Sequence, residues 1–417
     1  MYSTYLKPTS LPKTRIKVVL FEGIHPSAAD AFHADGYTSV ATYPKALAGE
    51  ELAAAVKGAY FVGIRSATYL TREVFERADK LIGVGCFCIG TSQVDREAAE
   101  NRGIPVFNAP FSNTRSVAEL VLAETVMLMR GIPQRNAAAH RGRWLKTAAG
   151  AHEVRGKRLG IVGYGHIGTQ VGVLAEALGM QVQYYDIESK LALGNARPAP
   201  SLEALLAESD VVTLHVPQTP QTENLIGAAE LAVMPRGAKV INASRGKVVD
   251  IAALVAVLRS GQIGGAALDV FPAEPKGAGD EFVSPLRDFD NVILTPHVGG
   301  STEEAQASIG VEVAEKLIKY SNNGSTLGAV NFPQVSLPEH PGKHRLLHIH
   351  RNQPGMLSQI NAVFSKYDVN ICGQYLQTDP TIGYVVIDVE TRKAAATRKL
   401  KDELERIPGT VRARLLY

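Results

Sequence analysis

Residues Arg158 to Gly168 read R-L-G-I-V-G-Y-G-H-I-G, an apolar strand that runs into the pattern G-x-G-x-x-G. In such a turn Gly163 lets the chain leave the strand sharply, and Gly165 lets the backbone approach a pyrophosphate. Gly168 lets the following helix pack closely on the sheet, and the N–H groups at the start of that helix face the phosphates. The stretch predicts a nucleotide-binding turn. Its place well inside the chain predicts that another folded segment precedes it.

A second strand, at residues 180–185, ends at Asp186, close to the spacing of the acidic residue that binds the adenosine ribose. A carboxylate at this position repels a 2′-phosphate, so the sequence favours NAD over NADP. The alternative is that the glycines are only turn residues and that Asp186 is a solvated strand end. The complete strand, turn, helix and strand context favours the cofactor site.

The composition is that of a soluble globular protein of two or three domains, with 417 residues, 45% hydrophobic and 20% charged. A net charge of +3 is too small to predict a nucleic-acid partner, although it suits small anionic substrates. The three cysteines do not make a disulfide framework, and we expect Cys86 and Cys88 to lie buried on one face of a strand. No run approaches the roughly 18 apolar residues of a membrane helix. We therefore expect a cytoplasmic protein with no membrane partner and no metal site.

Short apolar strands alternate with helical stretches from residue 16 onward, which predicts parallel βαβ units. We expect strands at 17–21, 39–42, 60–64, 81–84 and 106–108, and helices at 27–34 and 49–56. A long helix begins near Ser116 and carries apolar residues almost all round, so we expect it to be buried between domains or subunits.

The segment after residue 157 has a strand–helix rhythm of its own, with strands expected at 159–162, 182–185, 211–215, 238–242, 265–270 and 292–295. Six such strands fill a doubly wound sheet. An amphipathic helix at 302–320 then returns to the first domain. The predicted fold class is therefore α/β, with a Rossmann NAD-binding domain (113–299) inserted in a flavodoxin-like substrate-binding domain (1–112 and 300–332).

Residues 333–343 are polar and rich in proline, which predicts a linker. Beyond it we expect a strand, a helix, two strands, a helix and a last strand, at 345–350, 356–367, 370–378, 384–390, 393–406 and 411–416. This βαββαβ order predicts a ferredoxin-like domain at residues 344–417.

Three chemically useful side chains follow strands of the nucleotide-binding domain, at the sheet edge where open α/β sheets bind ligands. Arg245 suits a planar carboxylate, because its fork makes two parallel hydrogen bonds. His297 takes and returns protons near neutral pH, and Glu274 is the candidate carboxylate that orients it. Taken singly, the alternatives are a surface salt bridge for Arg245, a satisfied loop histidine for His297 and a solvated carboxylate for Glu274. Together, at successive strand ends after a nucleotide turn, they favour a catalytic site.

Three segments carry a family resemblance: N-A-S-R-G-K-V-V-D at 242–250, A-A-L-D-V-F-P-A-E-P at 266–275 and L-T-P-H-V-G-G-S-T at 294–302. They resemble signature segments of the D-2-hydroxyacid dehydrogenases, and the resemblance covers nearly the whole chain. It implies that Arg245 binds substrate, Glu274 supports the histidine and His297 is the acid/base. It further implies a set of cofactor contacts: Gly163, Gly165, His166, Ile167, Gly168, Asp186, Ala243, Ser244, Arg245, Asp269, His297, Val298, Gly299 and Gly300.

The resemblance is strongest to members that oxidise D-3-phosphoglycerate to 3-phosphohydroxypyruvate, the first step of serine biosynthesis. It implies Arg65, Ser66 and Asn113 as substrate contacts. Where the family pattern often has a second basic residue after Arg-Ser, this chain has Ala67. Lys45 and Lys146 are candidates to compensate, although Lys45 is as readily a solvated lysine.

The C-terminal segment H-I-H-R-N-Q-P-G-M-L, at 348–357, resembles the entry of ACT domains, which sense amino acids. The resemblance implies that His350, Asn352 and Asn370 bind serine across a pair of these domains, and that the protein is a homotetramer inhibited by serine. The alternative is a domain that only dimerises. Gly299 and Gly300 are either a hinge for closure or a simple turn.

Two other functions remain open. One is another D-2-hydroxyacid dehydrogenase, such as one that reduces 2-oxoglutarate, a reaction that we also expect as a side activity. The other is an NAD-sensing binding protein related to dehydrogenase-like corepressors. The sensing domain and the presence of Arg245, Glu274 and His297 favour the enzyme.

Overall fold

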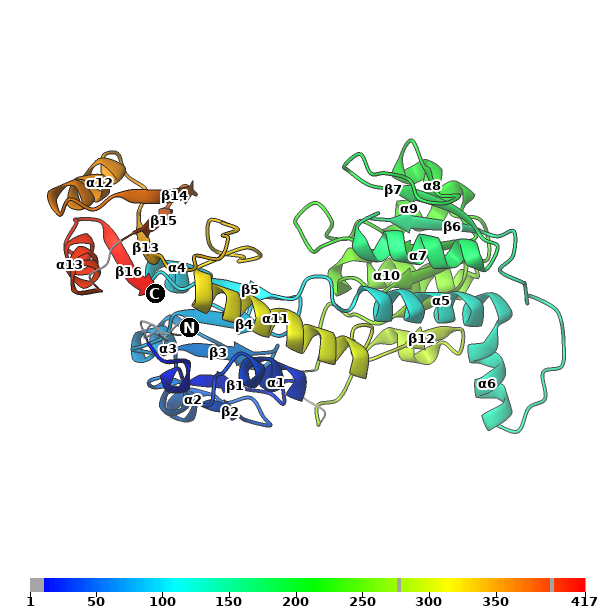
Figure 1. Cartoon of the computed structure of the whole chain (residues 1–417). Coiled ribbons are helices and arrows are strands. Elements are labelled where there is room, and N and C mark those ends of the chain that lie inside the picture. The colour runs from blue at the N-terminus through cyan, green and yellow to red at the C-terminus, as the bar shows by residue number, and fades with distance from the viewer. Residues whose placement is uncertain (1–10, 276–278, 391–393, 417) are drawn as a thin grey trace, which may run out of the picture. The chain divides into compact units, whose positions relative to one another are not determined.

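The computed structural model describes residues 11–275, 279–390 and 394–416. The chain forms two compact units, the first made of residues 1–112 and 306–417 and the second of residues 113–305. Figure 1 shows their helices and strands. No helix within these described ranges is both long and apolar enough to span a bilayer.

The first unit contains a five-stranded parallel sheet in the order β2-β1-β3-β4-β5, and this order is the flavodoxin-like topology that the sequence predicted. Val18 and Leu20 of β1 point into one apolar core and Val19 into the other, so the sheet is buried on both faces. Its strands are β1 (Val18–Leu20), β2 (Val40–Thr42), β3 (Phe61–Ile64), β4 (Gly83–Cys86) and β5 (Val106–Asn108).

The thiols at 86 and 88 do not share a strand face as expected. Strand β4 ends at Cys86, which is buried, whereas Cys88 lies beyond the strand and is only partly buried. The Cys88 thiol donates to the Gly90 carbonyl oxygen at 3.2 Å. The prediction of two buried thiols is therefore correct for Cys86 and wrong for Cys88.

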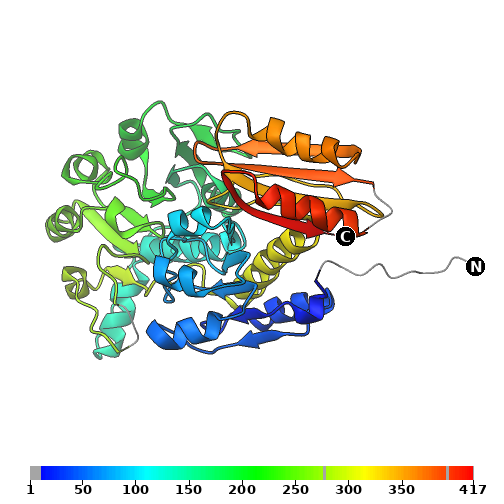
Figure 2. The same ribbon diagram turned by 90° about the vertical axis from the view of Figure 1, so that its left-hand side faces the viewer.

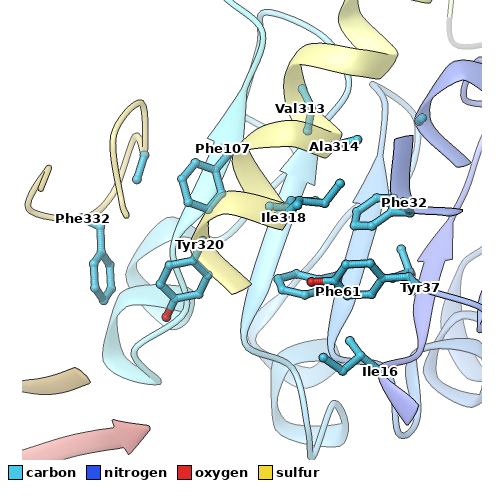
Figure 3. Packing of buried hydrophobic residues seen from close by; sticks show 14 of the residues in the cluster. Ile16, Phe32, Tyr37, Phe61, Phe107, Val313, Ala314, Ile318, Tyr320 and Phe332 are labelled. Atoms are coloured by element: carbon cyan, nitrogen blue, oxygen red, sulfur yellow. The ribbon is translucent and has the colours of Figure 1, made fainter. Parts of the chain in front are cut away.

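Helix α11 (Glu303–Asn323) forms much of the core of the first unit. A side chain at Gly85 would place its Cβ 2.6 Å from Val313, so glycine lets the helix lie close to β4. Figure 3 shows Phe107 of β5 beside Tyr320 of α11, and their ring centroids lie 6.0 Å apart. The predicted helix at 302–320 is confirmed, with three more residues at its end. The other helices around this sheet are η1 (Lys13–Arg15), α1 (Pro26–Ala34), α2 (Gly49–Val56), α3 (Arg72–Arg77) and α4 (Arg96–Asn101).

The C-terminal part of this unit is a four-stranded antiparallel sheet in the order β14-β15-β13-β16, with two helices. Leu346 and Leu415 face these helices, and their neighbours Leu347 and Leu416 face the core that contains α11. The ferredoxin-like βαββαβ prediction is confirmed (Figure 2). Its elements are β13 (His344–Arg351), α12 (Met356–Lys366), β14 (Ile371–Thr378), β15 (Ile382–Val389), α13 (Ala394–Glu405) and β16 (Thr410–Leu416).

The segment that leads into this sheet is more firmly packed than a loose linker. Val335 and Leu337 are buried, and Thr326 donates its hydroxyl proton to the Pro333 carbonyl at 2.7 Å. The fully buried Arg345 pairs with both oxygens of Asp388, at 2.6 and 2.8 Å. The guanidinium also donates to the carbonyl oxygens of residues 323 and 338, so its buried charge is paired and its donors are used.

The second unit contains a seven-stranded parallel sheet in the order β12-β11-β10-β9-β6-β7-β8. Six of the strands were predicted. The seventh, β8, has only two residues, one of them Pro198, and gave no strand pattern. Because all seven strands are parallel, their carboxyl ends meet at one edge of the sheet. The strands are β6 (Arg158–Val162), β7 (Gln181–Tyr185), β8 (Arg197–Pro198), β9 (Val211–Leu214), β10 (Ala238–Asn242), β11 (Ile263–Leu268) and β12 (Val292–Leu294).

Helix α5 (Thr114–Arg130) is less apolar than predicted. Val117 and Val121 share a core with α7, but Arg115, Glu119 and Ala123 form an exposed stripe. An ion pair of 2.6 Å joins Arg115 to Glu119. Burial within the chain is thus found for the face of Val117 and Val121, and burial of the other face against a subunit stays a prediction. The other helices are α6 (Ile132–His140), α7 (His166–Ala177), α8 (Leu202–Glu208), α9 (Ala228–Val233), η2 (Gly246–Val248), α10 (Ile251–Ser260) and η3 (Pro285–Asp288).

Candidate active site

The turn between β6 and α7 has the backbone that its three glycines predict. Gly163 has a φ of 90°, and a Cβ there would collide with the carbonyl oxygen of His215. A Cβ at Gly168 would collide with the Gly163 carbonyl, whereas one at Gly165 would meet no described atom within 4 Å. The backbone is therefore open at Gly165, in front of the helix that starts at His166 and Ile167. This shape fits a pyrophosphate at the start of α7.

Asp186 lies directly after β7 and is tied to this turn. One carboxylate oxygen accepts the Tyr164 N–H at 2.8 Å and the other accepts the Glu188 N–H at 2.9 Å. The two bonds fix the carboxylate beside the glycine turn, where the ribose of a dinucleotide lies in this kind of fold. The accepting carboxylate of Asp186 and the open backbone at Gly165 together fit NAD.

Asp269, after β11, holds the segment that follows β12. Its buried carboxylate accepts the Thr295 hydroxyl at 2.7 Å and the N–H groups of Val298 and Gly299, both at 2.8 Å. A Cβ at Gly299 would lie only 2.9 Å from the same carboxylate. Between these anchors His297 has a φ of 55°, a left-handed conformation that a residue with a Cβ adopts only when its surroundings enforce it.

His297 and Glu274 form a hydrogen-bonded pair, in which Nδ1 lies 2.9 Å from Oε2. The second carboxylate oxygen accepts the Phe271 N–H at 3.1 Å, which orients the carboxylate. Since a carboxylate only accepts, Nδ1 carries a proton and Nε2 is left for a substrate. The histidine side chain is 53% exposed and the glutamate 35%. Both line a cavity of about 580 Å³ with Phe271, Pro275, Asp280, Phe282, Leu294, Thr295 and Pro296.

Arg245 follows β10 in a loop that Asn242 shapes. The Asn242 side chain accepts from Ser244, through N–H at 3.1 Å and hydroxyl at 2.8 Å, and donates to the Arg245 carbonyl at 3.0 Å. A Cβ at Gly246 would collide with the Phe271 backbone, so this loop lies against the one that carries Glu274. Sequence reasoning did not single out Asn242. Its position as the last residue of a strand, just before A-S-R, was the available signal.

Among the predicted substrate contacts, Arg65 and Ser66 follow β3 in the first unit, and Asn113 directly precedes α5 in the second. Glu22 accepts the Arg65 N–H at 2.9 Å, and Gln93 donates to the Arg65 carbonyl at 2.5 Å. The Asn113 side chain is buried against Gly300, while Lys45 and Lys146 are exposed.

In the C-terminal sheet, His350 is almost completely buried, and its Nδ1 has no hydrogen-bond partner among the described residues. Its ring stacks on His348 at 5.3 Å. Burial lowers the pKa of His350, and burial followed by the charge of His350 lowers the pKa of His348 to about 4. Asn352 donates to the Asp379 carbonyl at 2.6 Å, and Asn370 is exposed just before β14.

Comparisons with known proteins define the class. The model of the D-isomer specific 2-hydroxyacid dehydrogenase, NAD binding domain, matches residues 122–299, and that of the AHAS small subunit-like ACT domain matches residues 346–412. A D-lactate dehydrogenase from Sporolactobacillus is 33% identical, with a TM-score of 0.66 over 77% of this chain and 100% of that one. The structure of D-2-hydroxyisocaproate dehydrogenase has a TM-score of 0.70 and 26% identity over 76% of this chain and 100% of that one. The chain belongs to the D-2-hydroxyacid dehydrogenase family, and it is an NAD-dependent dehydrogenase with a C-terminal ACT domain.

Relatives that match over almost the whole chain indicate a narrower group within this family. The chain is 62% identical over 408 residues to a D-3-phosphoglycerate dehydrogenase of Haemophilus influenzae, over 98% of this chain and 99% of the relative. It is 58% identical, with the same coverage, to the D-3-phosphoglycerate dehydrogenase of Escherichia coli K12. The similarity thus includes the C-terminal ACT domain, which lies outside the matched part of the dehydrogenase model.

Proposed function

We propose that the protein oxidises D-3-phosphoglycerate to 3-phosphohydroxypyruvate with NAD, the first step of serine biosynthesis. The observation that carries the proposal is the His297–Glu274 pair, with 2.9 Å between Nδ1 and Oε2, at the edge of a sheet that also presents Arg245. The names of the 62% and 58% identical relatives support the choice of substrate.

Each residue of the site has a separate role in the proposed reaction. Nε2 of His297 accepts the hydroxyl proton of the substrate, and Glu274 stabilises the imidazolium that forms. Arg245 binds the carboxylate with a two-pronged hydrogen bond and so orients the reacting carbon. NAD, held by the Gly163–Gly168 turn and Asp186, supplies the acceptor for the hydride. In reduction the protonated His297 returns the proton to the carbonyl oxygen.

The phosphate end of the substrate needs cations and hydrogen-bond donors of its own. We assign this role to Arg65, with Ser66 and Asn113 as hydrogen-bonding contacts. Lys45 and Lys146, both exposed, are the candidates to compensate for the missing basic side chain at Ala67. Because a second carboxylate is also bound by such cations, we include the reduction of 2-oxoglutarate to 2-hydroxyglutarate in the proposal.

Regulation and assembly belong to the same proposal. Serine binds to the ACT domain through His350, Asn352 and Asn370 and inhibits the enzyme. The buried Nδ1 of His350 supports this role, since it has no hydrogen-bond partner among the described residues. We further infer a homotetramer. The three free thiols suit the reducing cytoplasm.

The test is the rate of NADH oxidation with 3-phosphohydroxypyruvate, 2-oxoglutarate and glyoxylate, each with and without serine. We expect the highest kcat/KM with 3-phosphohydroxypyruvate, and a loss of that rate when serine is added. A preference for 2-oxoglutarate or glyoxylate would assign the chain to another D-2-hydroxyacid dehydrogenase. Binding of NADH without turnover of any substrate would indicate a sensing protein instead.

A further inference from the structure

Glu22, the second residue after β1, accepts three hydrogen bonds from the loop after β3. Its Oε1 accepts the N–H groups of Arg65 at 2.9 Å and Thr68 at 2.8 Å, and its Oε2 accepts the Ala67 N–H at 2.9 Å. The two strands are parallel neighbours in the sheet, so both loops lie at its carboxyl edge. One carboxylate thus fixes three of the four backbone N–H groups between residues 65 and 68.

The backbone N–H groups of Glu22 and Gly23 also bind the segment that follows β2. The N–H of Glu22 donates to the Lys45 carbonyl at 3.3 Å, and that of Gly23 donates to the Tyr43 carbonyl at 3.0 Å. Both turn residues are left-handed, with φ of 64° for Glu22 and 57° for Gly23. A glutamate in this conformation carries backbone strain, which the five hydrogen bonds offset. The turn therefore joins the segments that carry Lys45 and Arg65.

We propose that Glu22 is the positioning residue of the phosphate-binding edge, and that it sets the preference for a phosphorylated substrate over its unphosphorylated analogue. The inference rests on the proposed function, because it takes Arg65 as the phosphate ligand. Glu22 acts on the backbone, so that Arg65 is ordered before the substrate arrives and loses less freedom on binding.

The residue at 67 makes this positioning more important. With Ala67 in place of a second basic side chain, the loop after β3 offers the phosphate a single guanidinium. Gln93 holds the Arg65 carbonyl from the other side, at 2.5 Å. The loop is thus fixed through both its N–H and its carbonyl groups, and the Arg65 side chain is left to bind.

The test compares KM for 3-phosphohydroxypyruvate with KM for hydroxypyruvate, which lacks the phosphate. In Glu22→Gln the amide nitrogen is a donor and cannot accept a backbone N–H, so part of the loop is released. We expect KM for 3-phosphohydroxypyruvate to rise about tenfold, as for the loss of one charge-assisted hydrogen bond. KM for hydroxypyruvate, kcat and the affinity for NADH should change little.

Two further variants separate the carboxylate from the backbone. Glu22→Gly relieves the left-handed strain but removes the carboxylate. The ratio of KM for hydroxypyruvate to KM for 3-phosphohydroxypyruvate should therefore fall in Glu22→Gly as it does in Glu22→Gln. Glu51→Gln removes an exposed charge in α2 and should behave as the wild type. Thermal unfolding of each variant checks that it is folded.

The outcomes distinguish this inference from the proposed function. A wild type that does not prefer the phosphorylated substrate contradicts the proposed function, and the role of Glu22 with it. A wild-type preference that Glu22→Gln and Glu22→Gly both retain overturns the role of Glu22 alone. Equal increases of KM for both substrates also overturn it, because they indicate a general loss of structure.

Discussion

Two histidines, one in each compact unit, lie in contrasting surroundings. His297 is half exposed, and its Nδ1 is bonded to a carboxylate at 2.9 Å. His350 is 3% exposed and has another histidine, not a carboxylate, stacked on its ring. A carboxylate stabilises an imidazolium, whereas burial beside a second imidazole destabilises it. The same side chain is therefore suited to proton transfer in one region and to neutral hydrogen bonding in the other.

The difference also lies in the backbone. His297 has a left-handed conformation between the Thr295 hydroxyl and the Val298 N–H, both of which Asp269 binds, so its ring position depends on a loop. His350 lies in β13, hydrogen-bonded to strands on both sides. The proposed catalytic group is thus presented by a loop, whereas the proposed serine-binding group is fixed within a sheet.

The largest expected effect is on turnover. His297→Gln should lower kcat by about 10²- to 10⁴-fold, because it removes the proposed acceptor of the hydroxyl proton. Binding of NADH, measured by fluorescence, should persist. The exposed His140→Gln is the matched control and should retain full turnover. Loss of NADH binding in His297→Gln would instead mean that the residue supports the cofactor site.

The next effect is on stability in acid. The pKa of His348 is lowered from 6.5 to about 4, first by burial and then by His350. The folded protein therefore binds fewer protons than the unfolded chain between these values, so its stability is complete above about pH 6.5 and falls as the pH drops toward 4. The difference between the two pKa values, 6.5 minus 4, corresponds to a decrease in the free energy of unfolding on the order of 3 kcal/mol in acid.

The matching variant is His348→Gln, which cannot take up that proton. Its unfolding temperature should decrease less between pH 7 and pH 4.5 than that of the wild type. The exposed His33→Gln should keep the wild-type slope. An unchanged slope in His348→Gln would mean that His348 is not the group that senses acid.

The regular parts of both units could be predicted from local sequence patterns. The three glycines from Gly163 to Gly168, the strand ends at Arg245 and His297, and the βαββαβ order all depend on short stretches. Apolar runs predicted strands buried on both faces, since a parallel sheet excludes water from each side. Strand β8 was missed, because two residues have no periodicity.

The hydrogen bonds that hold these sites could not be predicted, because they join residues far apart in the sequence. Glu22 and Arg65 are 43 positions apart, and Asp269 and Val298 are 29 apart. Nothing local to Glu22 distinguishes it from a solvated glutamate. The exposed stripe of α5 was missed for a different reason, since the many apolar residues of the helix, among them Val117 and Ala118, concealed the spacing of Arg115 and Glu119.

The central claim is that His297 serves proton transfer and His350 serves serine binding. Its most direct test is the inhibition of His350→Gln by serine, measured with 3-phosphohydroxypyruvate and NADH. We predict that this variant keeps the wild-type kcat and needs at least about tenfold more serine for half inhibition, as expected when one buried hydrogen bond to a ligand is lost. A variant that loses turnover, or that serine inhibits as strongly as the wild type, would contradict the account.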